Sequence, residues 1–573
     1  MRRGLLLPLT LIPIAALVVV LPLVMHGCSC GHDFDFHLVS WFEAAAQFRA
    51  GVWHPSWAFS PAWNAGEPRF VFYPPLSWTV GALLGMVLPW GAVPVVYTWL
   101  AIAAAGLAMY RLARELEASE AGAMVAAAAY MANPYMMFTA YERTAYAELL
   151  AAAWIPLLLA AVLRERVTVM RVAVPVALLW LTNAPAAVMG CYALAVVAAV
   201  RLVLMVRRSD SKDGGMRERW MLTGRVSAGV ALGLGLAAFY VVPAAYERRW
   251  VQIKMAMVEG MRFGDNFLFH HTSDALHDEV LHTASMIAVG MMVAAVVVLI
   301  LAVVVLRSEA SHVSEARRGA PGFIGVRKRV VISIAVLVVV IAVLLTPVSG
   351  VVWRVAPEMA FLQFPWRWVA VLSAAVCAGI ALAAERVRVR PVWLCVGAVV
   401  MAAAIGWPSV HQFREECDDE DTVQARLAVF EAKTGTDATD EYTTGEADND
   451  ALLHADSAYW LSEDGDGRAP QSGKGLVPMH FAVDAGKAET LVMNLREYPA
   501  WRVRVNGTEV KERVARADGL IALPVGVGRS RVDVDYEMTS DRWVGDGVSL
   551  VALCLAIGFV GWKRRDADPS TAR

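Results

Sequence analysis

Long apolar runs recur along the chain and alternate with short polar connections. The first run follows Arg2 and Arg3 and holds roughly 20 apolar residues, enough for a helix to cross a bilayer. No small-residue cleavage site precedes "CSC", so we expect this helix to remain as a signal anchor. The pattern predicts about 12 membrane-spanning helices, the later ones near 92–110, 121–139, 146–163, 168–182, 186–206, 226–244, 283–306, 330–346, 368–384, 391–408 and 545–562.

One apolar segment does not fit this alternation. Residues 74–90, "PPLSWTVGALLGMVLPW", are short for a full crossing, and counting them as one would reverse the orientation of every later loop. We therefore expect a membrane-dipping or interfacial helix within the first outside loop.

Basic residues fall in alternate connections. If the first helix starts in the cytoplasm, the rule that short cytoplasmic loops are rich in Lys and Arg is met at each later inside loop. Those basic residues are Arg111, Arg114, Arg164, Arg166, Arg207, Arg208, Lys212, Arg217, Arg219, Arg317, Arg318, Arg327, Lys328, Arg329, Arg386, Arg388, Arg390 and the tail "WKRRDAD". We expect a multi-pass membrane protein with both termini in the cytoplasm. Its outside loops are expected at 26–91, 140–145, 183–185, 245–282, 347–367 and about 409–544.

The last outside loop has the character of a separate domain. It opens with an acidic stretch and then turns to alternating apolar and polar residues, typical of strands. In 501–514, Asn506-Gly507 lies between two such runs, which predicts a type I′ hairpin. The fold class is thus a polytopic α-helical membrane protein with a small extracytoplasmic β-rich domain, divided as 1–408, 409–544, and 545–573 for the final helix and tail.

Composition agrees with this fold class. Of 573 residues, 58% are hydrophobic and 18% are charged, and the mean hydropathy is +0.50, which excludes an ordinary soluble enzyme. A net charge of -2 gives no reason to expect nucleic acid as a partner. The seven cysteines show neither zinc-ligand nor disulfide-framework spacing.

Candidate chemistry begins where the first helix ends. "GHDFDFH" places Asp33 and Asp35 there, whereas the other five Asp-x-Asp pairs lie in the hydrophilic domain or the tail. Exposed carboxylates at that point would need no special explanation, but buried ones need a cation partner. If 32–48 form a helix, His37 lies one turn after Asp33 on the same face. The two carboxylates are candidate ligands for Mg²⁺ or Mn²⁺, and zinc is disfavoured because a clear third ligand is lacking.

Several segments resemble a known family. The membrane segments concerned are "GHDFDFHL", "AGEPRFVFYPPLSW", "NPYMMFTAYERTAYAE", "LTNAPAAV" and "FLQFPWRW". Through them the chain resembles bacterial membrane proteins labelled 6-pyruvoyl-tetrahydropterin synthase-related, which are similar in layout to GT-C glycosyltransferases, and "YPAWRVRVNG" resembles the C-terminal β-domain of YfhO-like proteins. The resemblance implies a place in the bacterial cytoplasmic (inner) membrane.

The resemblance implies a reaction. A GT-C enzyme would transfer a sugar, with inversion, from a polyprenyl-phosphate donor to a glycan, lipid or protein acceptor on the extracytoplasmic face of the bilayer. Asp33 or Asp35 would be the catalytic base or a metal ligand. "YPPL" lacks the basic residue that some relatives carry before the prolines. Substrate binding is therefore expected from the outer-face residues Arg69, Arg143 and Arg367, with His37, Glu67, Tyr141 and Glu148 as further candidates.

Other interpretations stay open. The arginines could snorkel or form salt bridges, for example Arg143 with Glu142 or Glu148. Asn183 is expected to cap a helix rather than to contact substrate. The loop 245–282 is expected to be an amphipathic surface helix, the alternative being a lid or a metal site built from His277, Asp278 and His282. The alternative function is a noncatalytic or transport-type protein, either a lipid or glycan flippase or a cell-envelope assembly factor.

Overall fold

The structure is a computed structural model that describes residues 3–206, 212–316, 321–384, 391–452, 457–463 and 475–565. Some of the basic residues expected in cytoplasmic loops lie outside the described residues: Arg207, Arg208, Arg317, Arg318, Arg386, Arg388, Arg390 and the end of the tail.

The described part of the chain is predominantly helical. Its α-helices are α1 (Arg3–His26), α2 (Phe34–Arg49), α3 (Arg69–Phe72), α4 (Pro75–Val87), α5 (Val93–Glu115), α6 (Glu120–Met131), α7 (Pro134–Tyr141), α8 (Tyr146–Ala151), α9 (Trp154–Leu163), α10 (Val169–Thr182), α11 (Ala184–Val206), α12 (Lys212–Leu236), α13 (Ala238–Glu247), α14 (Ala275–Ala316), α15 (Pro321–Leu344), α16 (Gly350–Val355), α17 (Val369–Ala383), α18 (Pro391–Phe413), α19 (Val423–Ala432) and α20 (Ser540–Arg565).

Within the described residues, seven helices are long and apolar enough to cross a membrane, or up to nine if each of two bent pairs is one span. The expected count of about 12 stays a prediction, because several expected spans are short or divided. The stretch 121–139 forms α6 and α7, separated where Pro134 cannot continue the first helix and the Asn133 side chain caps the second. The segment 74–90 forms α4, whose 13 residues are too few for a full crossing.

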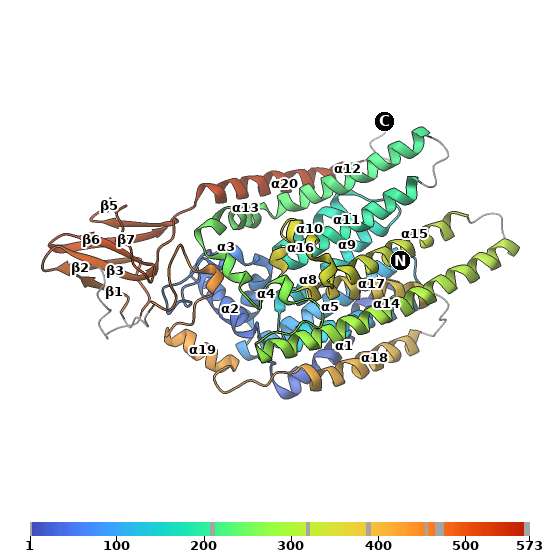
Figure 1. Cartoon of the computed structure of the whole chain (residues 1–573), viewed down its shortest axis with the longest axis horizontal. Coiled ribbons are helices and arrows are strands. Elements are labelled where there is room, and N and C mark those ends of the chain that lie inside the picture. Colours follow the sequence, from blue (N-terminus) through green and yellow to red (C-terminus); the bar gives the residue numbers. More distant parts are fainter. Residues whose placement is uncertain are drawn as a thin grey trace.

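The helices form an elongated bundle with the β-strands at one end (Figure 1). The start of α12, the end of α14 and the start of α15 lie toward the other end (Figure 1). At the end of α5, Glu115 binds Arg111, Arg164 and Arg171 at 2.8 to 3.5 Å. The described basic connections are thus remote from the β-strands, and their cytoplasmic orientation stays a prediction.

The loop 245–282 differs from the amphipathic surface helix expected for it. It forms short 3-10 turns at Arg248–Trp250, Ile253–Met257 (η3) and Phe263–Asp265, and α14 begins at Ala275. A continuous helix is prevented because Val251 forms a β-bridge with Thr444 and because Gly260 takes a positive φ of 84°.

Two antiparallel sheets form the β-rich region. Their strands are β1 (Tyr459–Ser462), β2 (His480–Ala485), β3 (Glu489–Arg496), β4 (Trp501–Val505), β5 (Thr508–Glu509), β6 (Leu520–Val525) and β7 (Gly528–Tyr536). The strand orders are β1-β3-β6 and β2-β7-β4-β5. The predicted hairpin is confirmed, since β4 pairs with β5 and both Asn506 and Gly507 have positive φ.

The segment between α2 and α3 packs into the core of this region. Trp57 contacts the rings of Tyr498 and Trp501, with centroids 5.5 and 5.4 Å apart. A disulfide between Cys30 and Cys417, which spacing did not suggest, joins the end of α1 to the segment after α18. The segment after α1 and the segment after α18 are therefore joined covalently on the same side of the bundle as the β-strands (Figure 1).

A buried ion pair anchors the start of α20. Arg542 donates to both carboxylate oxygens of Glu247, at 2.8 and 3.1 Å, and also to the hydroxyls of Tyr536 and Ser56 at 2.7 Å. Tyr498 donates to the same carboxylate. One guanidinium thus joins α13, α20, β7 and the first outside loop.

Arg542→Met is expected to destabilise the protein by about 3 kcal/mol, because it leaves the buried Glu247 carboxylate without its cation. The measurement is the free energy of unfolding of the purified protein, with the melting temperature as a second readout. The matched control is Arg531→Met, since Arg531 forms an exposed ion pair with Asp533 that is worth less than about 1 kcal/mol. Equal losses in the two variants would contradict the anchoring role.

Candidate active site

A cavity of about 600 Å³ lies between the helices and a segment that precedes the β-strands. Five of the residues predicted to be catalytic or substrate-binding line it: Asp33, His37, Arg143, Glu148 and Arg367. The other lining residues are His32, Phe36, Phe72, Tyr73, Pro74, Ala145, Asn183, Ala184, Pro185, Met261, Asp274, Leu276, His277, Val280, Gln363, Phe364, Trp366, Thr439, Glu441 and Tyr442.

Two arginines converge on one carboxylate in the cavity wall. Arg143 donates to Glu148 at 2.7 Å, and the Arg367 Nε atom lies 3.8 Å from the same oxygen. Tyr135 donates to the other oxygen of Glu148 at 2.5 Å. Arg143 also pairs with Asp33 at 3.6 Å. Burial opposes the charge of Arg143, but Glu148 and Asp33 outweigh it and raise the Arg143 pKa.

Each arginine lies close in sequence to a residue with an unusual backbone conformation. Thr144, directly after Arg143, has a φ of 45°, and Gln363, four residues before Arg367, has a φ of 60°. Residues other than glycine rarely adopt positive φ angles, and β-branched residues such as threonine adopt them least readily. The Asp33 N–H donates to the Arg143 carbonyl at 3.0 Å, so the start of α2 is fixed to the same turn.

His37 lies one turn into α2 and is 1% exposed. It is surrounded by the rings of Phe36, Trp41, Tyr73 and Tyr146, and its Nδ1 atom has no hydrogen-bond partner among the described residues. Burial lowers the pKa of His37 from 6.5 to about 4, so the imidazole is neutral near pH 7. A neutral imidazole nitrogen without a partner can donate a hydrogen bond to a ligand hydroxyl or accept one from it, depending on the tautomer.

The two aspartates of "GHDFDFH" have separate surroundings. The Asp33 carboxylate is 44% exposed and lies at the cavity beside Arg143. Asp35 belongs to α2, lies outside the cavity lining and pairs with Arg426 of α19 at 3.0 Å. Burial raises the pKa of Asp35, against the opposing effects of Arg426 and Arg69. Asp33 is therefore the aspartate available to a ligand in the cavity.

The positions of Asp33 and Asp35 can be compared with the Mg²⁺ or Mn²⁺ site expected at these two residues. Each carboxylate already has its own arginine, and the two belong to different surroundings. Among the described residues, no group of three or more His, Cys, Asp and Glu side chains could hold an ion. The donor set does not fit a shared Mg²⁺ or Mn²⁺ site, and His277, Asp278 and His282 do not form a metal site either.

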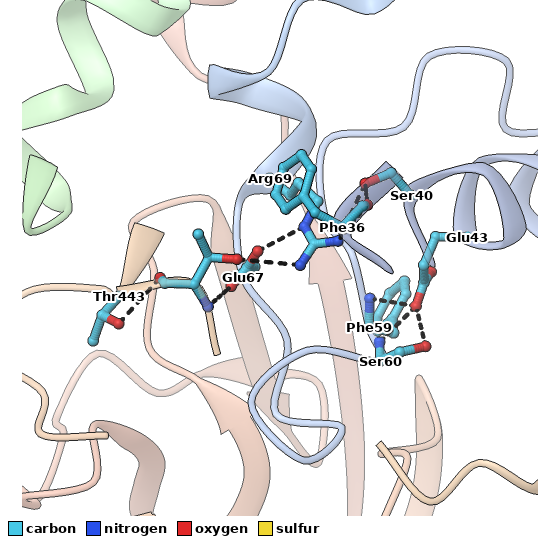
Figure 2. Close-up of polar contacts among 9 residues, drawn as sticks. Phe36, Ser40, Glu43, Phe59, Ser60, Glu67, Arg69 and Thr443 are labelled. Carbon is cyan, nitrogen blue, oxygen red and sulfur yellow. Dashed lines mark hydrogen bonds and ion pairs between the residues drawn. The ribbon is translucent and has the colours of Figure 1, made fainter. Parts of the chain in front are cut away.

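Glu67 and Arg69 form a junction outside the cavity lining (Figure 2). Arg69 donates to Glu67 at 2.7 Å, to the Ser40 hydroxyl at 3.1 Å and to the Thr439 hydroxyl at 3.2 Å. The other Glu67 oxygen accepts from the Thr439 N–H at 2.9 Å. Arg69 thus has its hydrogen bonds within the protein and joins α2 to the segment that precedes the strands.

The remaining predicted residues have structural partners. Tyr141 is buried and donates to the Val19 carbonyl at 2.7 Å, which joins α7 to α1 away from the cavity. The Asn183 side chain accepts from the Ala186 N–H at 2.8 Å, so it caps α11 as expected, and it also lines the cavity.

Sequence reasoning did not single out Tyr73, Thr439, Glu441 or Tyr442. Tyr73 stands in the quoted "FVFYPPLSW", so position in that segment could have suggested it. The last three belong to an irregular polar stretch of the C-terminal region, where neither periodicity nor spacing distinguishes them.

His37→Gln is expected to reduce the acid sensitivity of the fold. Below pH 6.5 the unfolded chain binds a proton that folded His37 does not take up until about pH 4, so stability falls as pH drops through this window. The full effect is about 3 kcal/mol. Melting temperatures of wild type and variant at pH 4.5 to 7.5 measure it, with His282→Gln at an exposed histidine as the control. Parallel curves for His37→Gln and wild type would contradict a buried neutral ring.

No protein-family model and no curated protein sequence matches the chain. Among solved structures it is similar to two cryo-EM structures of the arabinofuranosyltransferase AftD from Mycobacteria, the second a mutant form. Identities are 17% and 18%, and TM-scores are 0.41 and 0.39. Each match covers 70% of this chain but 26% and 28% of AftD, so the chain spans about a quarter of the length of that protein. The resemblance to 6-pyruvoyl-tetrahydropterin synthase-related and YfhO-like proteins stays a prediction.

Proposed function

We propose that the protein is a membrane glycosyltransferase that moves a sugar, with inversion, from a polyprenyl-phosphate donor to an acceptor on the extracytoplasmic face. The observation that carries the proposal is a single cavity that combines a half-exposed carboxylate, Asp33, with two arginines that share one counterion, Glu148. A base and a cationic site for the leaving phosphate are the two elements that such a displacement needs.

In this mechanism the acceptor hydroxyl oxygen attacks the anomeric carbon and forms the new glycosidic bond. The bond from that carbon to the phosphate oxygen breaks, and its electron pair leaves with the phosphate. Asp33 takes the acceptor proton. Arg367, with help from Arg143, stabilises the departing phosphate, and the neutral His37 holds a sugar hydroxyl. No step depends on a metal ion.

The apolar edge of the cavity supports a lipid-linked donor. Leu276 and Val280 line the cavity at the start of α14, and Leu276 is 76% exposed. Farther along the same helix, Met286 and Val293 also face outward. A polyprenyl chain could therefore lie along α14 within the bilayer while its phosphate reaches the arginines.

This function requires the β-rich end to be extracytoplasmic and the opposite end to be cytoplasmic. The basic residues around Glu115, at the end of α5, support that orientation. We propose that the protein lies in the bacterial inner membrane, with about 12 membrane-spanning helices.

Asp33→Asn is expected to lower sugar transfer about 100-fold or more, because the amide cannot accept the acceptor proton. Asp35→Asn should have a smaller effect, since Asp35 pairs with Arg426 outside the cavity. Transfer is measured in membrane vesicles from a radiolabelled pool of polyprenyl-phosphate sugars.

The melting temperature of each variant controls for folding. Unchanged transfer in Asp33→Asn would overturn its role as base. A wild-type protein that transfers no sugar from any donor, yet moves a lipid-linked sugar between leaflets, would favour the transport-type alternative.

Arg367→Met is expected to lower kcat/KM for the donor about 100-fold, because a phosphate-stabilising cation is removed. Arg367 suits this test better than Arg143, whose loss would leave Glu148 without its nearer partner. Arg354→Met is the matched control, since Arg354 is exposed on α16 and does not line the cavity. Equal kinetics in the two variants would remove Arg367 from the phosphate site.

A further inference from the structure

The wall of the cavity is completed by a segment far along the chain from the other lining residues. Thr439, Glu441 and Tyr442 are the described lining residues that come from the region after residue 409. They belong to residues 439–445, which contain a 3-10 turn, η9 (Asp440–Tyr442), and precede the first strand. We refer to residues 439–445 as the C-terminal wall segment.

This wall segment is held on both sides. On one side, the Thr439 N–H donates to Glu67 at 2.9 Å and the Tyr442 ring stacks on Phe72 with centroids 5.6 Å apart. On the other, the Gln252 N–H donates to the Thr443 carbonyl and the Gly445 N–H to the Trp250 carbonyl, both at 2.9 Å. Contacts on both faces fix the backbone, so the side chains at the cavity are presented in a defined position.

Glu441 presents a carboxylate that the protein itself does not neutralise. Among the described residues, no side chain forms an ion pair or hydrogen bond with it, and it accepts from its own backbone N–H. Burial raises the pKa of Glu441, and the nearby carboxylates Glu67 and Asp440 act in the same direction. Arg69, the nearby cation, is already engaged by Glu67 at 2.7 Å.

The charged groups in and around the cavity form two sets, one near Glu441 and one near Arg143. The charged groups that act most strongly on Glu441 are Glu67, Asp440 and Arg69. The strongest partners of Arg143 are instead Glu148 and Asp33. A phosphate is attracted to the arginine region and repelled by a carboxylate, whereas a sugar hydroxyl donates readily to a carboxylate.

We infer that the C-terminal wall segment forms the acceptor subsite, in which the Glu441 carboxylate accepts hydrogen bonds from hydroxyl groups of a carbohydrate acceptor. Tyr442 and Phe72, stacked on each other, provide an apolar surface beside it. This inference rests on the proposed function, because it assigns the second substrate of the same cavity. Acceptor choice would then be encoded in the C-terminal region and donor binding in the membrane helices.

The test separates sugar binding from phosphate binding in the full-length protein in lipid nanodiscs. The probes are a panel of methyl glycosides of hexoses and pentoses, and methyl phosphate, titrated by saturation-transfer NMR. Glu441→Gln is expected to weaken glycoside binding about tenfold or more and to leave methyl phosphate binding within about twofold of wild type. Arg367→Met should show the reverse pattern.

Glu446→Gln is the matched control, because Glu446 is an exposed carboxylate close by in sequence that does not line the cavity. It should change neither affinity. The inference is overturned if Glu441→Gln leaves glycoside binding unchanged, if it weakens both probes equally, or if the wild type binds no glycoside in the panel. Because these titrations need no turnover, the glycosyltransferase proposal can fail in the transfer assay while the sugar subsite is upheld here.

Discussion

Glu148 lies buried between two guanidinium groups, 2.7 Å from Arg143 and 3.8 Å from Arg367. Unit charges about 4 Å apart interact by about 4 kcal/mol at an effective dielectric constant near 20. One carboxylate cannot neutralise two arginines, and Asp33, at 3.6 Å from Arg143, offsets the surplus while remaining partly open to solvent. The arrangement of the cavity depends on this network of four charges, because it holds both guanidinium groups at the cavity wall, where they can bind an anionic ligand.

The cavity also depends on contacts between the segment that links α2 to α3 and the region that follows α19. Trp57, between α2 and α3, packs against Trp501 of β4. Glu67 and Arg69, which pair with each other in Figure 2, both bind Thr439. The β-rich region is therefore part of the architecture of the site rather than an appended module. A change at this junction would alter the shape of the cavity without touching Asp33 or the arginines.

Local signals predicted those parts of the molecule that local interactions determine. The Asn506-Gly507 hairpin needs two residues with positive φ, and the sequence shows them directly. Hydropathy placed Asp33 and Asp35 together at a helix end, but only the structure separates them, because Asp35 meets Arg426, nearly 400 residues away, on α19. The Cys30 to Cys417 disulfide and the Glu441 position arise from contacts of this long-range kind, which spacing along the chain does not reveal.

That disulfide has a consequence for biosynthesis. Its two cysteines are 387 residues apart, which ribosomes translate in roughly 20 to 80 s at about 5 to 20 residues per second. The membrane-exit residues of α2 are thus made and inserted long before the polypeptide that covers them. During that interval the charges that are buried in the finished fold remain accessible to water and to chaperones. Assembly of this protein therefore ends when its last third has been made, rather than when its first helices are inserted.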